Sequence, residues 1–324
     1  MKDEGLKVVE FLKEWTLPVS MLTGAFLYLL FAYVPALDAV GDFFDPIIAT
    51  IFPMFMFLVL FVTFCKVDFR RLRPVGWHWW VGLFQLLFVW IIVGAIIVFH
   101  IQGDQLVLLE SVLTCIIGPC AAAAAVVTSK LGGNLEEMTT YTFLSNFLTA
   151  ILVPVCFPLI DHTVDMPFWA AFWLILQKVF MVLVMPMALA YVVKHYMHRF
   201  HQWVVSVKDL SFYIWGMSLT IVTGTTVKNI VHANTTAWFL CLIAGLGLLV
   251  CLIQFAIGRY VGHFFSRTQE SGQALGQKNT AFAIWIAYTY LNPLSSVGPG
   301  CYILWQNFIN SIELWQHQRH LNQK

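Results

Sequence analysis

The stretch Gly276-Gln277-Lys278-Asn279-Thr280 places a lysine beside the run Ala281-Phe282-Ala283-Ile284-Trp285-Ile286-Ala287, which is as apolar as lipid. A charge near the middle of a bilayer is expensive, and such residues usually face a cavity and mark a transport path, a proton relay or a counter-ion. A glycine and two amides loosen the helix around this lysine. We therefore interpret Lys278 as a functional residue at a break in a membrane helix.

The composition of the whole chain fits this interpretation. The 324 residues are 60% hydrophobic and 11% charged, with a mean hydropathy of +0.78. A soluble domain carries about twice that charged fraction, so we expect an all-α multi-pass membrane protein. A net charge of +1 argues against a nucleic-acid partner. The chain has no Walker A segment, HExxH or GxSxG motif, so we expect no enzyme.

Seven cysteines lie mostly within apolar runs and form no CxxC pair, which is typical of small buried side chains. The segment His195-x-x-His198-x-x-His201 has a spacing that could suit a metal site, but it lies in a basic loop beside Arg199. We therefore expect neither a metal site nor a cofactor.

Ten segments have the roughly 20 mostly apolar residues that a membrane span needs. The first five are 15–34, 46–65, 77–99, 106–129 and 135–160, and the others are 168–193, 210–230, 238–258, 271–291 and 299–316. Residues 1–14 precede them as a cytoplasmic segment, and residues 317–324 follow as a cytoplasmic tail.

Basic residues set the orientation of these spans. With the N-terminus in the cytoplasm, Lys228 alone falls in an outside loop, and only Lys178 and Lys278 fall within the membrane. The positive-inside rule thus predicts an inner-membrane protein with both termini cytoplasmic. The fifteen basic residues on the inside are Lys2, Lys7, Lys13, Lys66, Arg70, Arg71, Arg73, Lys130, Lys194, Arg199, Lys208, Arg259, Arg267, Arg319 and Lys324.

Two of the ten spans contain polar interruptions, and these two are the fourth and the ninth. The fourth breaks at Gly118 and Pro119, where proline removes a backbone donor, and the ninth breaks at Gly276. Ten spans divide into five plus five, and an odd number per half gives the halves opposite topologies. The pattern predicts two inverted five-helix repeats, 15–160 and 168–316, whose broken helices cross at a binding site near the midplane.

Two stretches resemble the bile acid:sodium symporter family. The first runs from Cys115 through Gly118-Pro119-Cys120 to the Gly133-Asn134 corner and a Thr-rich helix that ends at Pro154. The second contains Gly276-Gln-Lys-Asn279 and, further on, Trp305-Gln-Asn307. The chain resembles a divergent bacterial-type member of this family over all ten spans in outline.

The resemblance implies a core of spans three to five and eight to ten, and a panel of spans one, two, six and seven. Substrate would bind in the cleft between core and panel, near the crossing of spans four and nine. Members of the family carry bile acids and other organic anions, driven by sodium. An organic anion, the lipid bilayer and either H+ or Na+ are therefore the expected partners; the oligomeric state is not predicted.

The chain departs from the family at the ion site. When the two stretches above are matched to the family, the positions of four sodium ligands fall on residues without a side-chain oxygen. The position of a family glutamine falls on Lys278. Thr142 retains a family threonine, and Gln85 matches another ligand. Hard cations require a shell of oxygens, so these losses indicate that the sodium site has been abandoned. The four positions are Ala124, Ala125, Met138 and Ala274.

We hypothesise that the ammonium of Lys278 occupies the place of a sodium ion. Burial disfavours a charged amine, so Lys278 could carry the proton of a coupled cycle or act as a permanent tether. The alternative is a lysine paired with Glu136, Glu137 or Glu270 as a packing device.

The expected function is secondary active transport of an organic anion, with Lys178 of the sixth span as a second cation for the substrate. Alternatives are sodium symport with ligands from backbone carbonyls, Thr142 and Gln85, or a sensor that keeps the fold without transport. The polar residues predicted to line the site on spans nine and ten are Gln277, Lys278, Asn279, Thr280 and Asn307.

Overall fold

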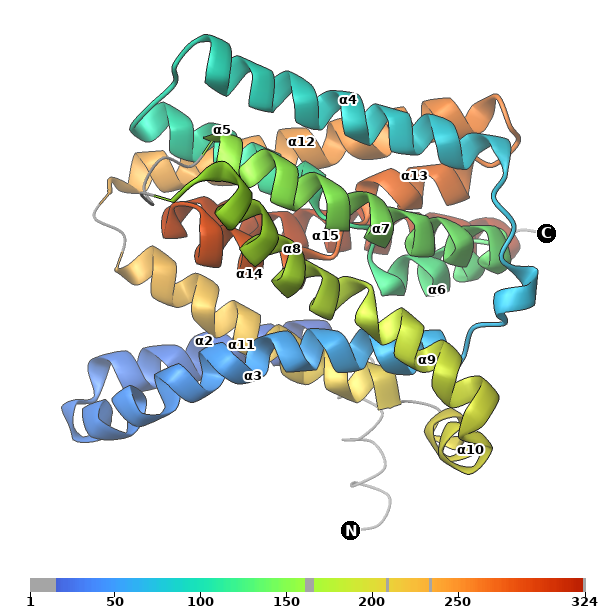
Figure 1. Ribbon diagram of the computed structural model, residues 1–324, viewed down its shortest axis with the longest axis horizontal. Coiled ribbons are helices and arrows are strands. Elements are labelled where there is room, and N and C mark those ends of the chain that lie inside the picture. Colours follow the sequence, from blue (N-terminus) through green and yellow to red (C-terminus); the bar gives the residue numbers. More distant parts are fainter. Residues whose placement is uncertain (1–15, 161–165, 208–209, 233–234, 323–324) are drawn as a thin grey trace.

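Helices form the regular secondary structure of the computed structural model, which describes residues 16–160, 166–207, 210–232 and 235–322 (Figure 1). The predicted cytoplasmic segment 1–14 lies outside the described residues. Each of the ten predicted spans coincides with one α-helix or with two consecutive α-helices. The helices are α2 (Thr16–Tyr33), η1 (Pro35–Leu37), α3 (Asp38–Cys65), η2 (Phe69–Arg71), α4 (Gly76–Val98), α5 (Asp104–Ile117), α6 (Ala122–Lys130), α7 (Leu135–Ile160), α8 (Phe168–Leu183), α9 (Met185–Tyr196), α10 (His198–Ser206), α11 (Leu210–Val231), α12 (Ala237–His263), α13 (Thr268–Gly276), α14 (Thr280–Tyr290), η3 (Pro293–Ser296) and α15 (Val297–Asn322).

Four of these helices are long and apolar enough to cross a membrane, namely Pro46–Cys65 within α3, α4, α7 and α12. The pair α8 and α9, bent by 40°, gives a fifth when it is taken as one span. Large apolar side chains such as Leu22, Ile91 and Trp173 are exposed on the outside, as expected for a surface in contact with hydrocarbon. The chain is therefore a multi-pass membrane protein. The number of ten spans stays a prediction, because the predicted fourth and ninth are each divided between two short helices.

The helices form two groups (Figure 1). Helices α2, α3 and α11 pack against one another, and α4, α5, α12, α13 and α15 pack together on the other side. The bent pair α8–α9 runs diagonally between the groups, and α8 contacts both α7 and α3. Helix α11 contacts both α14 and α15. The division into panel and core remains a prediction, but the two helix breaks both belong to the second group.

Asparagines begin two of the helices that position the site. Asn134 accepts hydrogen bonds from the amides of Glu136 and Glu137, at 2.9 and 3.0 Å, and so caps α7. Asn279 accepts a bond from the amide of Phe282, at 3.2 Å, and caps α14. A cap of this kind satisfies backbone donors that the first helical turn leaves free. These two side chains therefore fix the residues at which α7 and α14 begin.

Candidate functional site

The first helix break lies between α5 and α6, at residues 118–121. Neighbouring helices supply donors for the carbonyls that the break frees. Gln85 of α4 donates from Nε2 to the carbonyls of Ile117 and Gly118, at 3.4 and 3.2 Å. Thr149 of α7 also donates to Ile117, at 2.8 Å. Among the described residues, the side chains that hold this break are neutral.

The same break exposes one amide that a serine satisfies. Ser145 of α7 accepts a hydrogen bond from the Cys120 amide, at 3.0 Å. The hydroxyl of Thr142 lies 3.7 Å from the Cys120 sulfur and also donates to the carbonyl of Met138, at 3.0 Å. Helix α7 therefore braces the first break along one face.

The second break lies between α13 and α14, at residues 277–279. Gln306 of α15 holds Lys278 from both sides, because its Oε1 accepts from the Lys278 amide at 2.9 Å and its Nε2 donates to the Lys278 carbonyl at 3.3 Å. Tyr302, one turn earlier, donates its hydroxyl to the carbonyl of Gly276, at 2.7 Å. Helix α15 thus does for the second break what α4 and α7 do for the first.

The two breaks meet and bond to each other. The amide of Asn279 donates to the carbonyl of Pro119, at 2.8 Å, and the amide of Ala121 donates to the carbonyl of Gln277, at 2.9 Å. These bonds make a single antiparallel bridge in which Cys120 lies opposite Lys278. Backbone groups freed within a membrane must be satisfied by protein or by a cavity, and the crossing satisfies four of them at once.

The Lys278 side chain is enclosed at this crossing. It is 1% exposed, and its Nζ has no hydrogen-bond partner among the described residues. The cysteines Cys115 and Cys120 lie within electrostatic reach of it. A buried ammonium without partners is costly, so the site keeps this lysine at an energetic expense.

None of the three acids considered as partners pairs with Lys278. Glu136 binds Arg71 at 2.7 Å, Glu137 binds Arg267 at 2.9 Å, and Glu270 accepts a bond from the Asn134 amide at 2.7 Å. All three lie near the cytoplasmic end predicted from the sequence. The interpretation of Lys278 as one half of an ion pair is therefore wrong.

A cavity of about 880 Å3 lies against the crossing. It is bounded by α3 and α11 on one side and by α6, α7, α14 and α15 on the other, so it separates the two groups of helices. Its walls are largely apolar, with Met56, Phe64, Trp215 and Leu219 on the α3 and α11 side. Six of the predicted site residues line it: Thr142, Gln277, Lys278, Asn279, Thr280 and Asn307.

Apart from Lys278, the charged side chains that line the cavity lie at its predicted cytoplasmic mouth. Lys66, Asp68, Arg71, Lys130 and Glu136 line this part. The Glu136 carboxylate, which accepts a hydrogen bond from Arg71, raises the pKa of that guanidinium above its usual value. Three basic and two acidic groups therefore face a solute that enters from this end.

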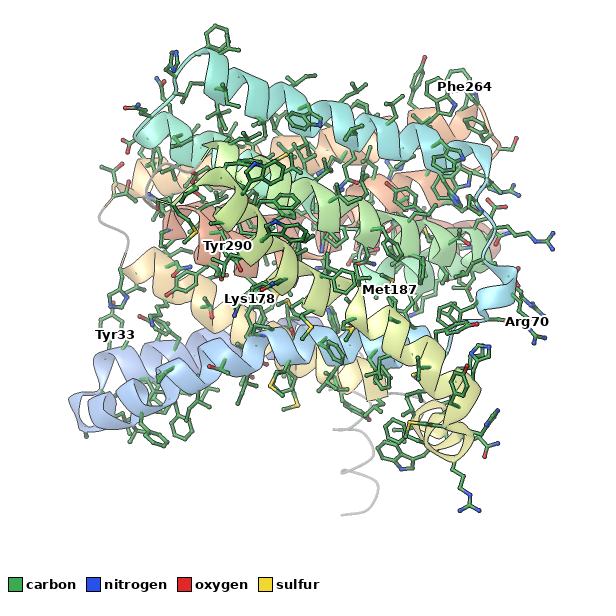
Figure 2. All side chains as sticks on the ribbon, in the orientation of Figure 1. Tyr33, Arg70, Lys178, Met187, Phe264 and Tyr290 are labelled. Carbon is green, nitrogen blue, oxygen red and sulfur yellow. The ribbon has the colours of Figure 1, made fainter. Side chains whose placement is uncertain are left out.

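Two of the predicted site residues do not line the cavity. Gln85 is fully buried and its amide nitrogen is committed to the first break. Lys178 is exposed on α8; Figure 2 shows it between the ends of the molecule marked by Tyr33 and Arg70, nearer to Tyr33. The structure therefore gives Gln85 a bracing role, and the substrate contact predicted for Lys178 has no support from its position.

The four positions that the resemblance assigns to lost sodium ligands come together in the fold. Ala124, Ala125, Met138 and Ala274 belong to one buried apolar cluster, which we call the alanine cluster. Its other members are Trp77, Val81, Cys120, Tyr141 and Leu275. These residues come from α4, α6, α7, α13 and the first break, so only the folded chain unites them. The side chains of the four positions themselves offer a cation no oxygen.

The residue most clearly missed by sequence reasoning is Gln306. It lies in the segment Trp305-Gln306-Asn307, from which the sequence prediction named only the neighbouring Asn307. Ser145, Thr149 and Tyr302 were also missed, because serine, threonine and tyrosine are common in membrane helices and only their bonds to the breaks distinguish them. Within the described part of the chain, no group of three His, Cys, Asp or Glu side chains could hold a metal.

Comparison with known proteins identifies the family. The sequence model of the sodium bile acid symporter family matches residues 53–233, which is more than half of the chain. The chain therefore belongs to this family of membrane transporters. No curated protein matches it. The matched region includes the first break and the alanine residues of α6 but ends before α12, so Lys278 lies outside it.

Proposed function

We propose that the protein is a secondary transporter of an amphipathic organic anion that works without a sodium ion, with the Lys278 ammonium in the place of that ion. Membership of the family supports transport. The observation that carries the sodium-independent part is the alanine cluster. Four positions assigned to sodium ligands lie together in a buried apolar group with Cys120, and Lys278, which pairs with Cys120 in the backbone bridge, has a buried amine. Sodium needs oxygens, and the cluster supplies none from its alanines and methionine.

The proposed architecture is ten spans in two inverted five-helix repeats, in a cell inner membrane with both termini cytoplasmic. The meeting of two broken helices, α5–α6 and α13–α14, supports this arrangement. Transport would proceed by alternating access, in which the group containing α2, α3 and α11 moves against the group that holds the crossing. No chemical reaction is assigned to the chain.

The cavity supports an organic anion as the substrate. Its volume of about 880 Å3 is within the roughly 300–1,000 Å3 of typical small-molecule sites. Apolar walls suit a hydrocarbon skeleton, and the basic side chains at the mouth suit a negative group. Amides and hydroxyls at the crossing, such as Asn279 and Thr280, would orient the polar end.

Uptake into proteoliposomes tests the proposal. Taurocholate is a suitable probe, because its sulfonate stays ionised and cannot carry protons through the lipid. We expect the native protein to take up taurocholate equally with a sodium gradient and with choline in place of sodium. An inward proton gradient should increase this uptake, and Lys278→Gln should abolish the increase. If removal of sodium abolishes uptake by the native protein, the sodium-independent proposal is wrong.

The second candidate is sodium symport through a rebuilt site. Five buried side-chain amide oxygens have no hydrogen-bond partner among the described residues, and such oxygens can ligate a cation; they are those of Gln85, Asn146, Gln254, Gln273 and Gln277. Sodium dependence of uptake would favour this candidate. Binding of taurocholate without any counterflow would instead favour a sensor that keeps the fold.

A further inference from the structure

A stripe of polar side chains runs along α7 toward the crossing. Glu137, Tyr141 and Ser145 are spaced by four residues, so they share one face of the helix. Glu137 begins the stripe near the predicted cytoplasmic end, where it accepts hydrogen bonds from Arg267 and from Trp77 Nε1, both at 2.9 Å. Ser145 ends it at the first break, on the amide of Cys120. The stripe therefore joins the solvent side to the residue opposite Lys278.

Two buried polar atoms beside this stripe have no partner in the described part of the chain. They are the hydroxyl of Tyr141 and Nε2 of His78, and both side chains are 2% exposed. The Nδ1 of His78 accepts from the Val75 amide at 3.1 Å, so the neutral ring carries its proton on Nε2. The two ring centroids are 5.8 Å apart. A donor and a hydroxyl thus lie close together in an otherwise apolar cluster, an arrangement that can hold an internal water.

Lys278 is closed off from the cavity in this state. Although the residue lines the cavity, its Nζ is buried. Cys120 lies opposite Lys278 across the bridge and belongs to the same buried cluster as Tyr141. A proton that exchanges with the amine therefore needs either an opening toward the cavity or polar groups that carry it through the protein, and the stripe supplies such polar groups.

We propose that protons reach Lys278 from the cytoplasmic side through the helices that hold the crossing, along internal waters ordered by His78 and Tyr141, and not through the substrate cavity. This inference rests on the proposed proton-coupled function. The water on the His78 side gives a proton to the Tyr141 oxygen while Tyr141 gives its own to a second water on the Cys120 side, so one O–H bond forms as another breaks. The second water passes a proton to the lone pair of the neutral Lys278 amine, and the cytoplasmic solvent returns a proton to the first water. His78 orients the water and stays neutral.

The charged and titratable groups around this route are few. Glu137, Arg267 and Glu270 stand at its cytoplasmic end, where they bond to one another or to the Asn134 amide. Cys115 and Cys120 face Lys278. The Tyr302 hydroxyl, on α15, is committed to the Gly276 carbonyl. Tyr141 is therefore the hydroxyl best placed to pass a proton between the two ends.

The first experiment measures proton exchange at Lys278 without any substrate. In protein labelled with nitrogen-15 lysine, the Nζ signal of Lys278 is assigned by its loss in Lys278→Met, and its hydrogen exchange with solvent is followed by NMR. We expect Tyr141→Phe to slow this exchange by about tenfold or more, which corresponds to about 1.4 kcal/mol in the barrier. Phenylalanine preserves the ring packing against Trp77. The control Tyr290→Phe removes a hydroxyl from α14, away from the stripe, and should leave the rate unchanged.

A second variant tests His78 without disturbing its helix. His78→Asn places an amide oxygen where Nδ1 accepts the Val75 amide, and it removes the Nε2 proton. We expect slower exchange at Lys278 in this variant as well. A midpoint of thermal unfolding equal to that of the native protein shows that each variant is folded. Unchanged exchange in both folded variants would overturn the proposed route.

Taurocholate uptake separates failure of the route from failure of the proposed function. If the route is correct, Tyr141→Phe lowers uptake driven by a proton gradient and preserves counterflow at equal pH. If the native protein shows no response to a proton gradient, the coupling in the proposed function is wrong, while the exchange measurement still decides the route. If the native protein responds and Tyr141→Phe responds equally, the route is wrong and the proposed function stands.

Discussion

The break between α5 and α6 and the break between α13 and α14 meet at one crossing, yet they are built differently. The first contains Pro119, and neutral side chains from α4 and α7 satisfy its freed groups. The second contains Lys278, whose backbone is held by Gln306 while its amine stays without a partner among the described residues. A kink that only shapes a helix needs no buried charge. We therefore interpret the first break as structural, and the proposed function assigns the transport role to the second.

Among the substitutions that test this comparison, Lys278→Met should have the largest effect on transport and stability. We expect transport of taurocholate driven by a proton gradient to fall to the level of protein-free vesicles. Stability should rise by about 1–3 kcal/mol, because an unpartnered polar group leaves the interior and an apolar chain of similar length replaces it. Uptake and thermal unfolding in detergent check the two parts. A fall in stability would show that the amine has a partner that stabilises the fold, and the contrast between the breaks would then weaken.

The glycines of the two breaks should respond differently to alanine. A Cβ at Gly276 would lie 2.4 Å from ring carbons of the buried Phe255, whereas one at Gly118 would have 3.6 Å to its nearest neighbour. We expect Gly276→Ala to cost about 1–3 kcal/mol, as overpacking does. Gly118→Ala should be tolerated, because its space is ordinary and its φ of −56° suits any residue. Thermal unfolding of the pair measures the difference, and equal losses would contradict the assigned packing.

The two glutamines that hydrogen-bond to the breaks, Gln306 and Gln85, should differ less in their effect on stability. Gln306→Leu leaves both the amide and the carbonyl of Lys278 without their side-chain partner, and we expect a loss of about 1–3 kcal/mol. Gln85→Leu should cost less, because Thr149 still donates to the Ile117 carbonyl and only Gly118 loses its bond. Thermal unfolding of the two variants side by side gives the ranking. The reverse ranking would mean that the first break is the more demanding of the two.

Lys178→Ala should have the smallest effect. Its side chain is exposed on α8 and does not line the cavity, so we expect stability to stay within about 0.5 kcal/mol of native. The concentration of taurocholate that gives half-maximal uptake should also be unchanged. A clear rise in that concentration would restore Lys178 as a substrate contact and would point to a second conformation in which α8 lines the cavity.

Much of this site could be predicted, because its main features are visible in short stretches of the sequence. Lys278 stands out because a lysine in an apolar segment is rare and costly, and Gly118, Pro119 and Gly276 mark helix breaks through backbone chemistry alone. The bonds of Gln306 and Ser145 were not predictable. A glutamine or serine in a membrane helix has many possible partners, and its partner depends on which helix lies beside it. The same limit explains why three acids near in sequence or topology were considered for Lys278, and none of them pairs with it.

The sequence by itself determined the membrane class and the positions of the helices and their two interruptions, because hydropathy, proline and glycine act through the local backbone. It also carried the resemblance to the family. Only the tertiary structure decided that the breaks bond to each other, that Ala274 joins Ala124, Ala125 and Met138 in the alanine cluster, and that the Lys278 amine is buried. These facts depend on contacts between segments more than a hundred residues apart, and no local preference encodes which segments meet.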